Sequence, residues 1–152
     1  MKKKKYNTLE FRNKRVFFDY KIFDKIEAGL ILTGTEVKSI RDSKISLNGS
    51  FCIIKDDGLY VKGIDIAVYS EGSYNNHEPK RDRKLLLHKK QIEKLKIKME
   101  EKSLTIVPIK LYPNEYGIFK LEIGIAKGRK KSDKREYIKE RETLIEIKRF
   151  TG

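Results

Sequence analysis

The chain has 152 residues, with 36 lysines and arginines against 22 aspartates and glutamates, and so a net charge of +14. This length suits one domain with a single hydrophobic core, and the single cysteine, Cys52, excludes an internal disulfide. No apolar run approaches the roughly 20 residues of a membrane span, and none follows the basic N-terminus as in a secretory signal. The composition therefore predicts a cytoplasmic protein with a polyanionic partner, a nucleic acid first and an anionic membrane second.

The N-terminal third changes from charge to alternation. Residues 1–15 hold seven basic residues and few apolar ones, which is typical of a mobile basic arm. Apolar and polar residues then alternate over residues 16–32 and predict one or two strands, weak or bulged at Gly29. Residues 34–41 follow and predict a short helix with Thr35 as its N-cap.

The middle of the chain contains the clearest turn. Two apolar runs, 51–55 and 59–66, flank Asp56-Asp57-Gly58 and predict a β-hairpin. Residues 69–83 have no apolar periodicity and predict a long loop, a kind of segment that often carries function. Apolar residues at helical spacing then predict an amphipathic helix over about residues 88–102.

The C-terminal part begins with two further strands. Alternation predicts them at residues 105–111, with Pro108 at an edge or bulge, and at residues 119–126. After these strands the chain becomes strongly basic, which predicts a tail.

The summed pattern predicts a fold that is mainly β with helices. Short, mostly antiparallel strands are better accommodated by closure than by an open sheet with two edges. We therefore expect an OB-like closed barrel of about six strands, two or three flanking helices and an extended basic C-terminal tail. The predicted boundaries are 1–15 for the basic arm, 16–126 for the barrel and 127–152 for the tail.

The sequence offers poor candidates for catalysis. Cys52 lies in the apolar run 51–54, where a buried, inert thiol is expected. One cysteine and two histidines are too few for a Cys/His metal site, and nothing fixes His77 and His88 as an acid–base pair. The residues therefore predict a binding protein that is not an enzyme and needs neither a cofactor nor a metal.

The segment Lys80-Arg81-Asp82-Arg83-Lys84 is the best RNA-binding candidate. It is rich in arginine, whose flat guanidinium suits phosphates and stacked bases, and nearby aromatic rings can stack on unpaired bases. A merely solvated loop is the alternative. With the basic residues of the short helix, the predicted RNA-binding residues are Lys38, Arg41, Tyr74, His77, Lys80, Arg81, Arg83 and Lys84.

Five ordered motifs carry a resemblance to a known family. They are Glu27-Ala-Gly-Leu30, Gly34-Thr-Glu-Val-Lys-Ser-Ile-Arg41, Arg83-Lys-Leu-Leu-Leu87, Leu121-Glu-Ile-Gly-Ile-Ala-Lys-Gly128, and Asp133-Lys-Arg135 with Ile138-Lys-Glu-Arg141. Together they resemble the SsrA-binding protein family, small protein B of bacterial trans-translation, over nearly the whole chain.

The resemblance implies an OB-like barrel with a basic tail, and a specific partner. That partner is the tRNA-like domain of transfer-messenger RNA, bound at its D-loop and elbow and delivered to stalled ribosomes. In the family the body stands in for the missing anticodon arm, and the tail enters the empty messenger channel at the decoding centre as a helix. Elongation factor Tu and alanyl-tRNA synthetase are implied as indirect partners on the same RNA, and no membrane is involved.

The resemblance also implies site residues. By motif, the RNA-binding positions are Glu27, Leu86 and Lys120; core packing is the alternative for Leu86. A carboxylate repels phosphate, so we expect Glu27 to accept from base amino groups or to orient a cation. Many relatives carry a stacking residue where this chain has Ser132, and Tyr137 is the nearest aromatic. The implied decoding-centre residues are Lys127, Arg129, Lys130, Lys131, Ser132, Asp133, Lys134, Arg135, Tyr137, Ile138, Lys139 and Arg141.

The tail's conformation and two other functions remain open at this point. Residues 133–149 have a helical pattern, but a lone helix of that length is marginal in water. We therefore predict disorder in the free protein and ordering on the ribosome, with packing on the barrel as the alternative. The competing functions are a general basic RNA chaperone and a metal-dependent RNA-processing nuclease built on Asp24, Glu36 and Lys38.

Overall fold

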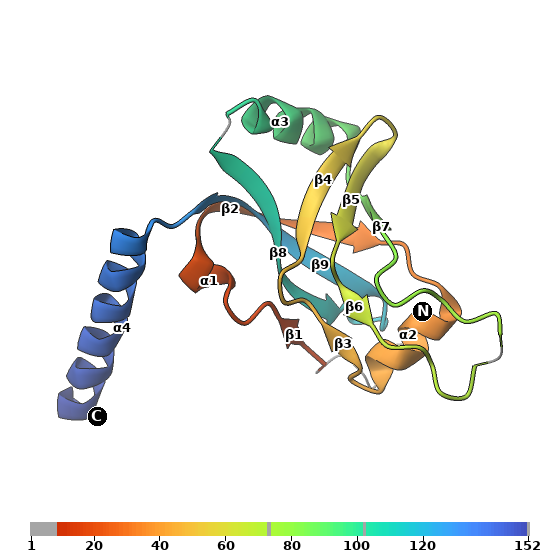
Figure 1. The fold of residues 1–152 in the computed structure, drawn as a ribbon, viewed down its shortest axis with the longest axis horizontal. Helices are drawn as coiled ribbons and strands as arrows, with labels where there is room; N and C mark the ends of the chain where they lie inside the picture. The colour runs from red at the N-terminus through yellow and green to blue at the C-terminus, as the bar shows by residue number, and fades with distance from the viewer. Residues whose placement is uncertain (1–8, 73, 102, 152) are drawn as a thin grey trace.

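The computed structural model describes residues 9–72, 74–101 and 103–151 (Figure 1). Within them the chain forms β1 (Phe11–Arg12), α1 (Val16–Asp19), β2 (Tyr20–Leu30), α2 (Gly34–Arg41), β3 (Ile45–Ser46), β4 (Phe51–Lys55), β5 (Gly58–Lys62), β6 (Asp65–Ile66), β7 (Arg83–Leu86), α3 (Lys89–Met99), β8 (Leu104–Pro113), β9 (Phe119–Gly128) and α4 (Lys131–Thr151). Of the four helices in the described residues, α1, α2 and α3 flank the strands, which confirms the predicted two or three, and α4 occupies the predicted tail.

Strands from the whole chain close into a ring. The sheet order is β1-β8-β4-β5-β7-β2-β9, and β8 also pairs with β9. In the described part of the chain, β8, β4, β5, β7, β2 and β9 therefore form a closed antiparallel circuit of six strands, as predicted. Figure 1 shows α3 beside one end of the ring, α2 beside the other, and α4 standing apart from it.

The strand β9 supplies much of the interior of the ring. It pairs with β2 along one edge and with β8 along the other. Its alternation places the apolar side chains inside, where Phe119, Leu121, Ile123 and Ile125 are buried. They share one core with buried residues of the other strands, among them Ala28, Leu59, Val61, Leu85, Ile106 and Leu111.

The helix α2 is capped by Thr33, not by Thr35. Thr33 Oγ1 accepts a hydrogen bond from the Glu36 N–H at 3.4 Å, and Glu36 Oε1 accepts one from the Thr33 N–H at 2.8 Å. This reciprocal capping box satisfies two backbone donors at once and needs Glu36 three residues after the cap, a spacing that Thr35 lacks. The Thr35 hydroxyl instead lies 2.9 Å from His77 Nδ1.

The segment 16–32 differs from its predicted form in two places. Its first four residues form α1, and a single strand, β2, follows. The register of β2 against β9 shifts between Ile22 and Asp24, which places the bulge at Phe23. Gly29, where a weakness was predicted, keeps regular partners on both sides.

Part of the predicted N-terminal arm belongs to the body. Phe11 and Arg12 form β1 and pair with β8. The buried Asn13 donates a hydrogen bond from Nδ2 to the Pro108 carbonyl at 3.0 Å. The first eight residues of that arm, 1–8, lie outside the described residues.

Two local predictions about the strands are confirmed. Lys55 pairs with Gly58 across the turn of the β4–β5 hairpin, and Gly58 has a φ of +143°, which favours glycine. The register of β8 against β9 shifts directly after Pro108, as expected for a bulge. The predicted strand 59–66 is divided, because β6 leaves the hairpin and pairs with β3 in a second, two-stranded sheet.

A buried ion pair connects α2 to the long loop before β7. The side chains of Glu36 and Arg83 are fully buried, and Arg83 Nε donates to Glu36 Oε2 at 2.5 Å. Arg81 donates to the other carboxylate oxygen at 2.7 Å. Arg83 also donates to the carbonyls of Ile64 at 2.8 Å and Pro79 at 2.9 Å, so one guanidinium connects the start of β7 to the residue before β6 and to the loop.

The same contacts determine the ionisation of Glu36. Burial alone would raise the pKa of this carboxyl group, but hydrogen bonds from Arg81, from the Thr33 backbone and from Arg83 outweigh it and lower the pKa from 4.5 to about 2. Glu36 is therefore a carboxylate at neutral pH, as the two arginines require.

We predict that Glu36→Gln lowers the free energy of unfolding by about 3 kcal/mol at neutral pH, because it leaves Arg83 buried without a counter-charge. The folded-state pKa of Glu36 lies below its ordinary value, so its contribution is present above pH 4.5 and is lost as pH falls toward 2. The difference between the two proteins should therefore narrow in acid. Urea unfolding at about pH 7 and about pH 3 measures both effects.

Glu93→Gln is the matched control, because Glu93 is exposed on α3 and should change stability little. Equal loss of stability in the two variants, or a difference that grows in acid, would contradict the assigned role of Glu36.

Candidate nucleic-acid interface

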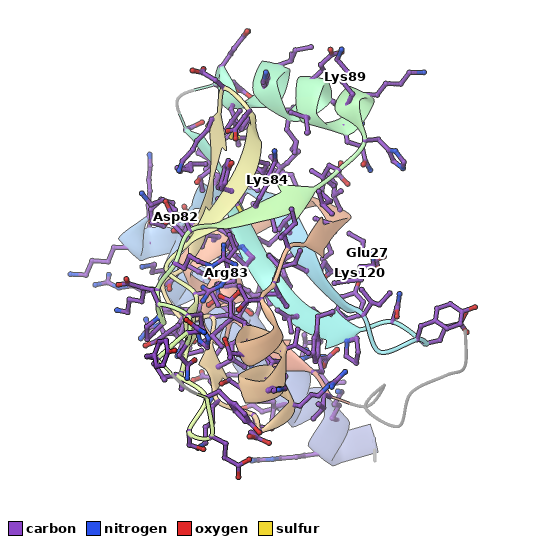
Figure 2. All side chains as sticks on the ribbon, turned by 90° about the vertical axis from the view of Figure 1, so that its right-hand side faces the viewer. Glu27, Asp82, Arg83, Lys84, Lys89 and Lys120 are labelled. Carbon is purple, nitrogen blue, oxygen red and sulfur yellow. The ribbon has the colours of Figure 1, made fainter. Side chains whose placement is uncertain are left out.

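The three residues implied by motif lie together on the outer face of the ring. Leu86 of β7 pairs with Gly29 of β2, Gly29 pairs with Lys120 of β9, and Lys120 pairs with Tyr112 of β8. Glu27 lies two residues before Gly29 on β2 and therefore faces the same side. Figure 2 shows Glu27 and Lys120 close together at this face. We call Glu27, Leu86, Tyr112 and Lys120 the Glu27 surface.

Tyr112 holds the carboxylate of Glu27 in place. Its hydroxyl donates a hydrogen bond to Glu27 Oε2. Partial burial, then this hydrogen bond and the negative charge of Glu27, raise the pKa of Tyr112 above its ordinary value of 10. Tyr112 therefore stays protonated and remains a donor at physiological pH. The sequence analysis missed this residue, although it lies directly opposite Lys120.

Leu86 is a surface residue and does not pack in the core. Its side chain is 53% exposed, whereas the preceding Leu85 is buried, as alternation along β7 requires. A Cβ atom at Gly29 would lie 3.1 Å from the Cβ of Leu86, which is tighter than ordinary packing. Glycine at this position therefore leaves room for Leu86 on the exposed face.

The Glu27 surface borders a shallow hollow with mixed chemistry. The lining comes from β2, β7, β9 and the start of α3: Glu27, Gly29, Leu86, Leu87, His88, Gln91 and Lys120. Among the described residues, the long loop contributes none of them. An ammonium suits a phosphate, a fixed carboxylate suits a base amino group, and an exposed leucine suits a base or ribose face. The surface can thus distinguish an RNA feature as well as attract charge.

Some of the predicted loop and α2 residues are accessible. Tyr74 is 96% exposed, and Lys80 is exposed further along the same loop. Lys38 is exposed on α2, and its Nζ lies 5.5 Å from the centre of the Tyr69 ring. Arg41 is half-buried at the end of the same helix. These residues can offer charge and one aromatic ring to a nucleic acid.

Two further predicted residues already have anionic neighbours. Arg81 is bound to Glu36, and its side chain is 35% exposed. Lys84 Nζ lies 4.0 Å from the Asp57 carboxylate. Such half-exposed cations still contribute to the surface potential, but they are less free to bind phosphate than Lys80.

Burial removes Arg83 and His77 from any direct contact with RNA in this structure. The guanidinium of Arg83 is used entirely inside the protein, and Figure 2 shows it within the body. His77 is 8% exposed, with Nε2 2.8 Å from the Ile66 carbonyl and Nδ1 facing Thr35. A carbonyl only accepts, so Nε2 carries the proton. Both residues organise the loop that presents Tyr74 and Lys80.

The geometry does not assemble the nuclease constellation. Both oxygens of Glu36 are bound by arginines, Lys38 faces Tyr69, and Asp24 lines a groove beside α3. Within the described residues, no group of three or more His, Cys, Asp and Glu side chains could hold a metal. Burial raises the pKa of the Cys52 thiol, which agrees with an inert cysteine.

The helix α4 is attached to the body through α1. The Arg129 N–H donates to the Asp19 carbonyl at 2.9 Å, and Lys134 Nζ lies 3.6 Å from the Asp19 carboxylate. The rings of Tyr137 and Phe18 pack at 6.4 Å between centres, and the Arg129 guanidinium lies 4.6 Å from the Tyr137 ring. We call these five residues the tail anchor. Tyr137 is therefore engaged within the protein and does not stand free in place of a stacking residue at position 132.

The remaining tail residues are exposed. They include Lys127, Lys130, Lys131, Ser132, Asp133, Arg135, Ile138, Lys139 and Arg141. Asp133 accepts a hydrogen bond from the Lys130 N–H at 3.2 Å and so caps the start of α4. Leu144 and Ile145 add exposed apolar area further along. In this structure α4 is helical and stands apart from the ring (Figure 1), and the predicted disorder of the tail in the free protein stays a prediction.

A small closed ring of antiparallel strands, a face that combines cation, carboxylate and apolar groups, and a basic helix beside it define a class: a basic nucleic-acid-binding β-ring protein. Comparison with known proteins gives the particular family. The family model described as SmpB protein matches residues 10–152. This chain therefore belongs to the SmpB family.

Individual relatives agree with this assignment. The chain is 47% identical to an SsrA-binding protein of Parabacteroides distasonis, over 98% of this chain and 97% of the relative. It is 49% identical to an SsrA-binding protein of Thermosipho melanesiensis, over 91% and 94%. A solved chain, described under "tmRNA-SmpB: a journey to the center of the bacterial ribosome", is 44% identical with a TM-score of 0.68, covering 85% of this chain and 94% of that one. None of these descriptions names a catalytic activity.

Within residues 9–72, 74–101 and 103–151, no helix is long and apolar enough to span a membrane.

We predict that Tyr137→Ala loosens the start of α4. The variant lacks the packing against Phe18 and Arg129, and an aromatic contact of this kind is worth about 1 kcal/mol. Amide exchange in residues 129–141 should become about fivefold faster, as measured by hydrogen exchange and mass spectrometry.

Ile138→Ala is the control, because Ile138 is the adjacent, exposed residue of the same helix. Equal exchange in the two variants, or exchange in the wild type as fast as in an unfolded chain, would show that the anchor does not hold the helix.

Proposed function

We propose that this protein is a non-enzymatic adaptor that binds the tRNA-like domain of transfer-messenger RNA and delivers that RNA to stalled ribosomes. The observation that carries the proposal is the gathering of Glu27, Leu86 and Lys120, which are distant in sequence, on one exposed face. Its family supports the identity of the RNA, because the relatives are SsrA-binding proteins. In this proposal the protein binds and delivers the RNA in the cytoplasm and needs no cofactor. Elongation factor Tu and alanyl-tRNA synthetase act on the same RNA.

The Glu27 surface supplies recognition in this proposal. Lys120 binds a phosphate, and Leu86 packs against an unstacked base or ribose. The carboxylate of Glu27, which Tyr112 holds in place, accepts hydrogen bonds from base amino groups, and the bound RNA places a base, not a phosphate, beside it. A feature that offers all three contacts is found in a folded RNA loop and not in a regular duplex. The exposed loop residues Tyr74 and Lys80 add peripheral contacts.

The tail supplies the ribosomal function. Its basic residues bind ribosomal RNA at the decoding centre and in the empty messenger channel, where phosphates are dense. The apolar residues Leu144 and Ile145 then find a surface that they lack in the free protein. In this proposal the tail anchor holds the first turns of α4 beside α1, and the part of α4 beyond Arg141 gains its contacts only on the ribosome.

We predict that Lys120→Ala weakens binding to transfer-messenger RNA about tenfold, because it removes a charge-assisted contact from the centre of the Glu27 surface. Binding to bulk tRNA should weaken less, so that the preference between the two RNAs falls. Titrations of both RNAs at physiological salt measure the effect.

Lys44→Ala is matched in charge and lies at an exposed position after α2. A general basic RNA chaperone would show equally reduced affinity for both RNAs in the two variants, with little preference at the start. That result would overturn the proposed recognition site.

We predict that a chain ending at Lys130 keeps its preference for transfer-messenger RNA but supports no peptide tagging on stalled ribosomes. This end point keeps β9 whole, because its last residues, Lys127 and Gly128, still pair with β2. Binding titrations and a tagging assay in a reconstituted translation system measure the two functions separately. Loss of the preference would show that the tail is an affinity arm and would refute the division between recognition and delivery.

A further inference from the structure

A second groove lies at the opposite end of the β2–β9 pair from the Glu27 surface. Its lining comes from β2, α3, β8 and β9 and consists of Phe23, Asp24, Lys94, Lys98, Glu101, Ser103, Leu104, Ile125 and Lys127. Lys120 and Lys127 are seven residues apart on β9, which corresponds to about 23 Å along a strand. The groove is therefore a separate site from the Glu27 surface. Of its lining residues the resemblance assigns a role only to Lys127, in the tail, and neither the motifs nor the comparisons assign a site to Phe23, Lys94 or Lys98. We call it the Phe23 groove.

Phe23 is exposed because of the bulge in β2. The register shift between Ile22 and Asp24 leaves Phe23 without a regular partner on β9. Its ring is 55% exposed, although a phenylalanine is normally buried. Lys21 Nζ lies 5.6 Å from the centre of the ring, so the aromatic face is already in a cationic setting.

Lysines form the walls of the groove. Lys94 and Lys98 are four residues apart on α3 and therefore lie on one side of that helix. The buried Leu95 fixes α3 against the core, so this wall has a defined position. On the other side Lys127 of β9 is paired with Lys21 of β2.

The remaining lining residues suit the edge and face of a base. Leu104 and Ile125 provide an apolar floor. Asp24 and Glu101 provide carboxylates that can accept from amino groups, and Ser103 provides a hydroxyl. Phe23 and Lys127 also line a neighbouring hollow at the root of α4, where Lys21, Arg129 and Lys130 add cations and Asp133, Glu136 and Glu140 add carboxylates. The cations thus continue from α3 to the tail.

We propose that the Phe23 groove binds an unpaired RNA nucleotide, with its base stacked on Phe23 and its flanking phosphates held by Lys94, Lys98 and Lys127. Single-stranded nucleic acid is bound in general by an exposed ring beside a track of cations, since every base has a face that can stack. A regular duplex hides those faces and meets only the lysines. An acidic peptide would pair with the lysines but would leave the exposed face of Phe23 without a stacked base.

The site does not depend on the proposed partner of the Glu27 surface. It binds unpaired RNA whichever RNA the other surface recognises, so the two proposals fail separately. When both are occupied by one molecule, the RNA must place a folded loop and an unpaired nucleotide at the separation set by β9.

The test uses the full chain and two probes: a 12-nucleotide oligouridylate carrying one 4-thiouridine, and a fully paired, blunt-ended RNA duplex of two strands. Phe23→Ala should weaken binding of the oligouridylate about tenfold and leave binding of the duplex unchanged, because only the single strand stacks on the ring. Phe23→Tyr keeps a ring and should bind like the wild type. Photocrosslinking of the 4-thiouridine should map to peptides that contain Phe23, and should disappear in Phe23→Ala.

The charge of the wall is tested in the same assay. Lys94→Ala with Lys98→Ala should reduce the salt dependence of oligouridylate binding, by about 0.7 in the logarithmic slope for each phosphate that the protein no longer neutralises. Lys90 lies on α3 outside the groove, so the Lys90→Ala variant should still form the crosslink. The proposal is overturned if Phe23→Ala binds the oligouridylate like the wild type, if it weakens binding of the duplex equally, or if the crosslink maps elsewhere.

Discussion

The pairing of β9 on both of its edges is the constraint on which the rest of the molecule depends. β2 lies along one edge and β8 along the other, so this strand closes the ring. Because side chains alternate along a strand, its register also decides which residues face outward. A slip of one residue would turn Lys120 into the core and expose Leu121, and the cross-strand row with Leu86 and Tyr112 would be broken. The same register places the end of β9 beside α1, and α4 begins directly after this point in the chain.

Positive charge has two different uses in this protein, and burial separates them. Arg83 lies wholly inside, where the desolvation of its guanidinium is offset by the carboxylate of Glu36 and by backbone carbonyls. Arg81 is shared between that carboxylate and the solvent. By contrast, Lys80 is exposed and Lys120 is half-buried on the outer face, and neither forms an ion pair within the described part of the chain. A net charge of +14 therefore indicates a polyanionic partner for the molecule as a whole, but it does not show which cations meet that partner.

The sequence predicted the features that local patterns determine. Alternation located β2, β8 and β9, and the glycine at position 58 located the β4–β5 hairpin, whereas β7 had no such signal. It could not predict the Glu27 surface from the residues alone, because that surface joins strands that are distant in sequence, and only the family motifs indicated it. Two residues could have been assigned correctly from the sequence. Tyr112 lies opposite Lys120 when the β8–β9 hairpin is drawn through its turn, so it belongs to the Glu27 surface. Arg83 shares the inward face of β7 with the buried Leu85, so it is a buried residue and does not contact RNA. The bulge at Phe23 lies beside the Asp24-Lys25 interruption of the apolar alternation, but the weak position was predicted at Gly29 instead.

The two ends of the β2–β9 pair offer different chemistry to one kind of partner. At one end a regular pairing presents Glu27 and Lys120, which can read a folded RNA loop. At the other end a bulge exposes Phe23 among lysines, which suits an unpaired nucleotide. Each contact alone is of modest strength, but a molecule that reaches both gains the second as an intramolecular event at a high effective concentration. Because β9 is paired on both sides, the separation of the two sites is rigid, and an RNA with the wrong spacing can use only one of them. Selectivity can therefore come from a distance fixed by the sheet as well as from the side chains at either site.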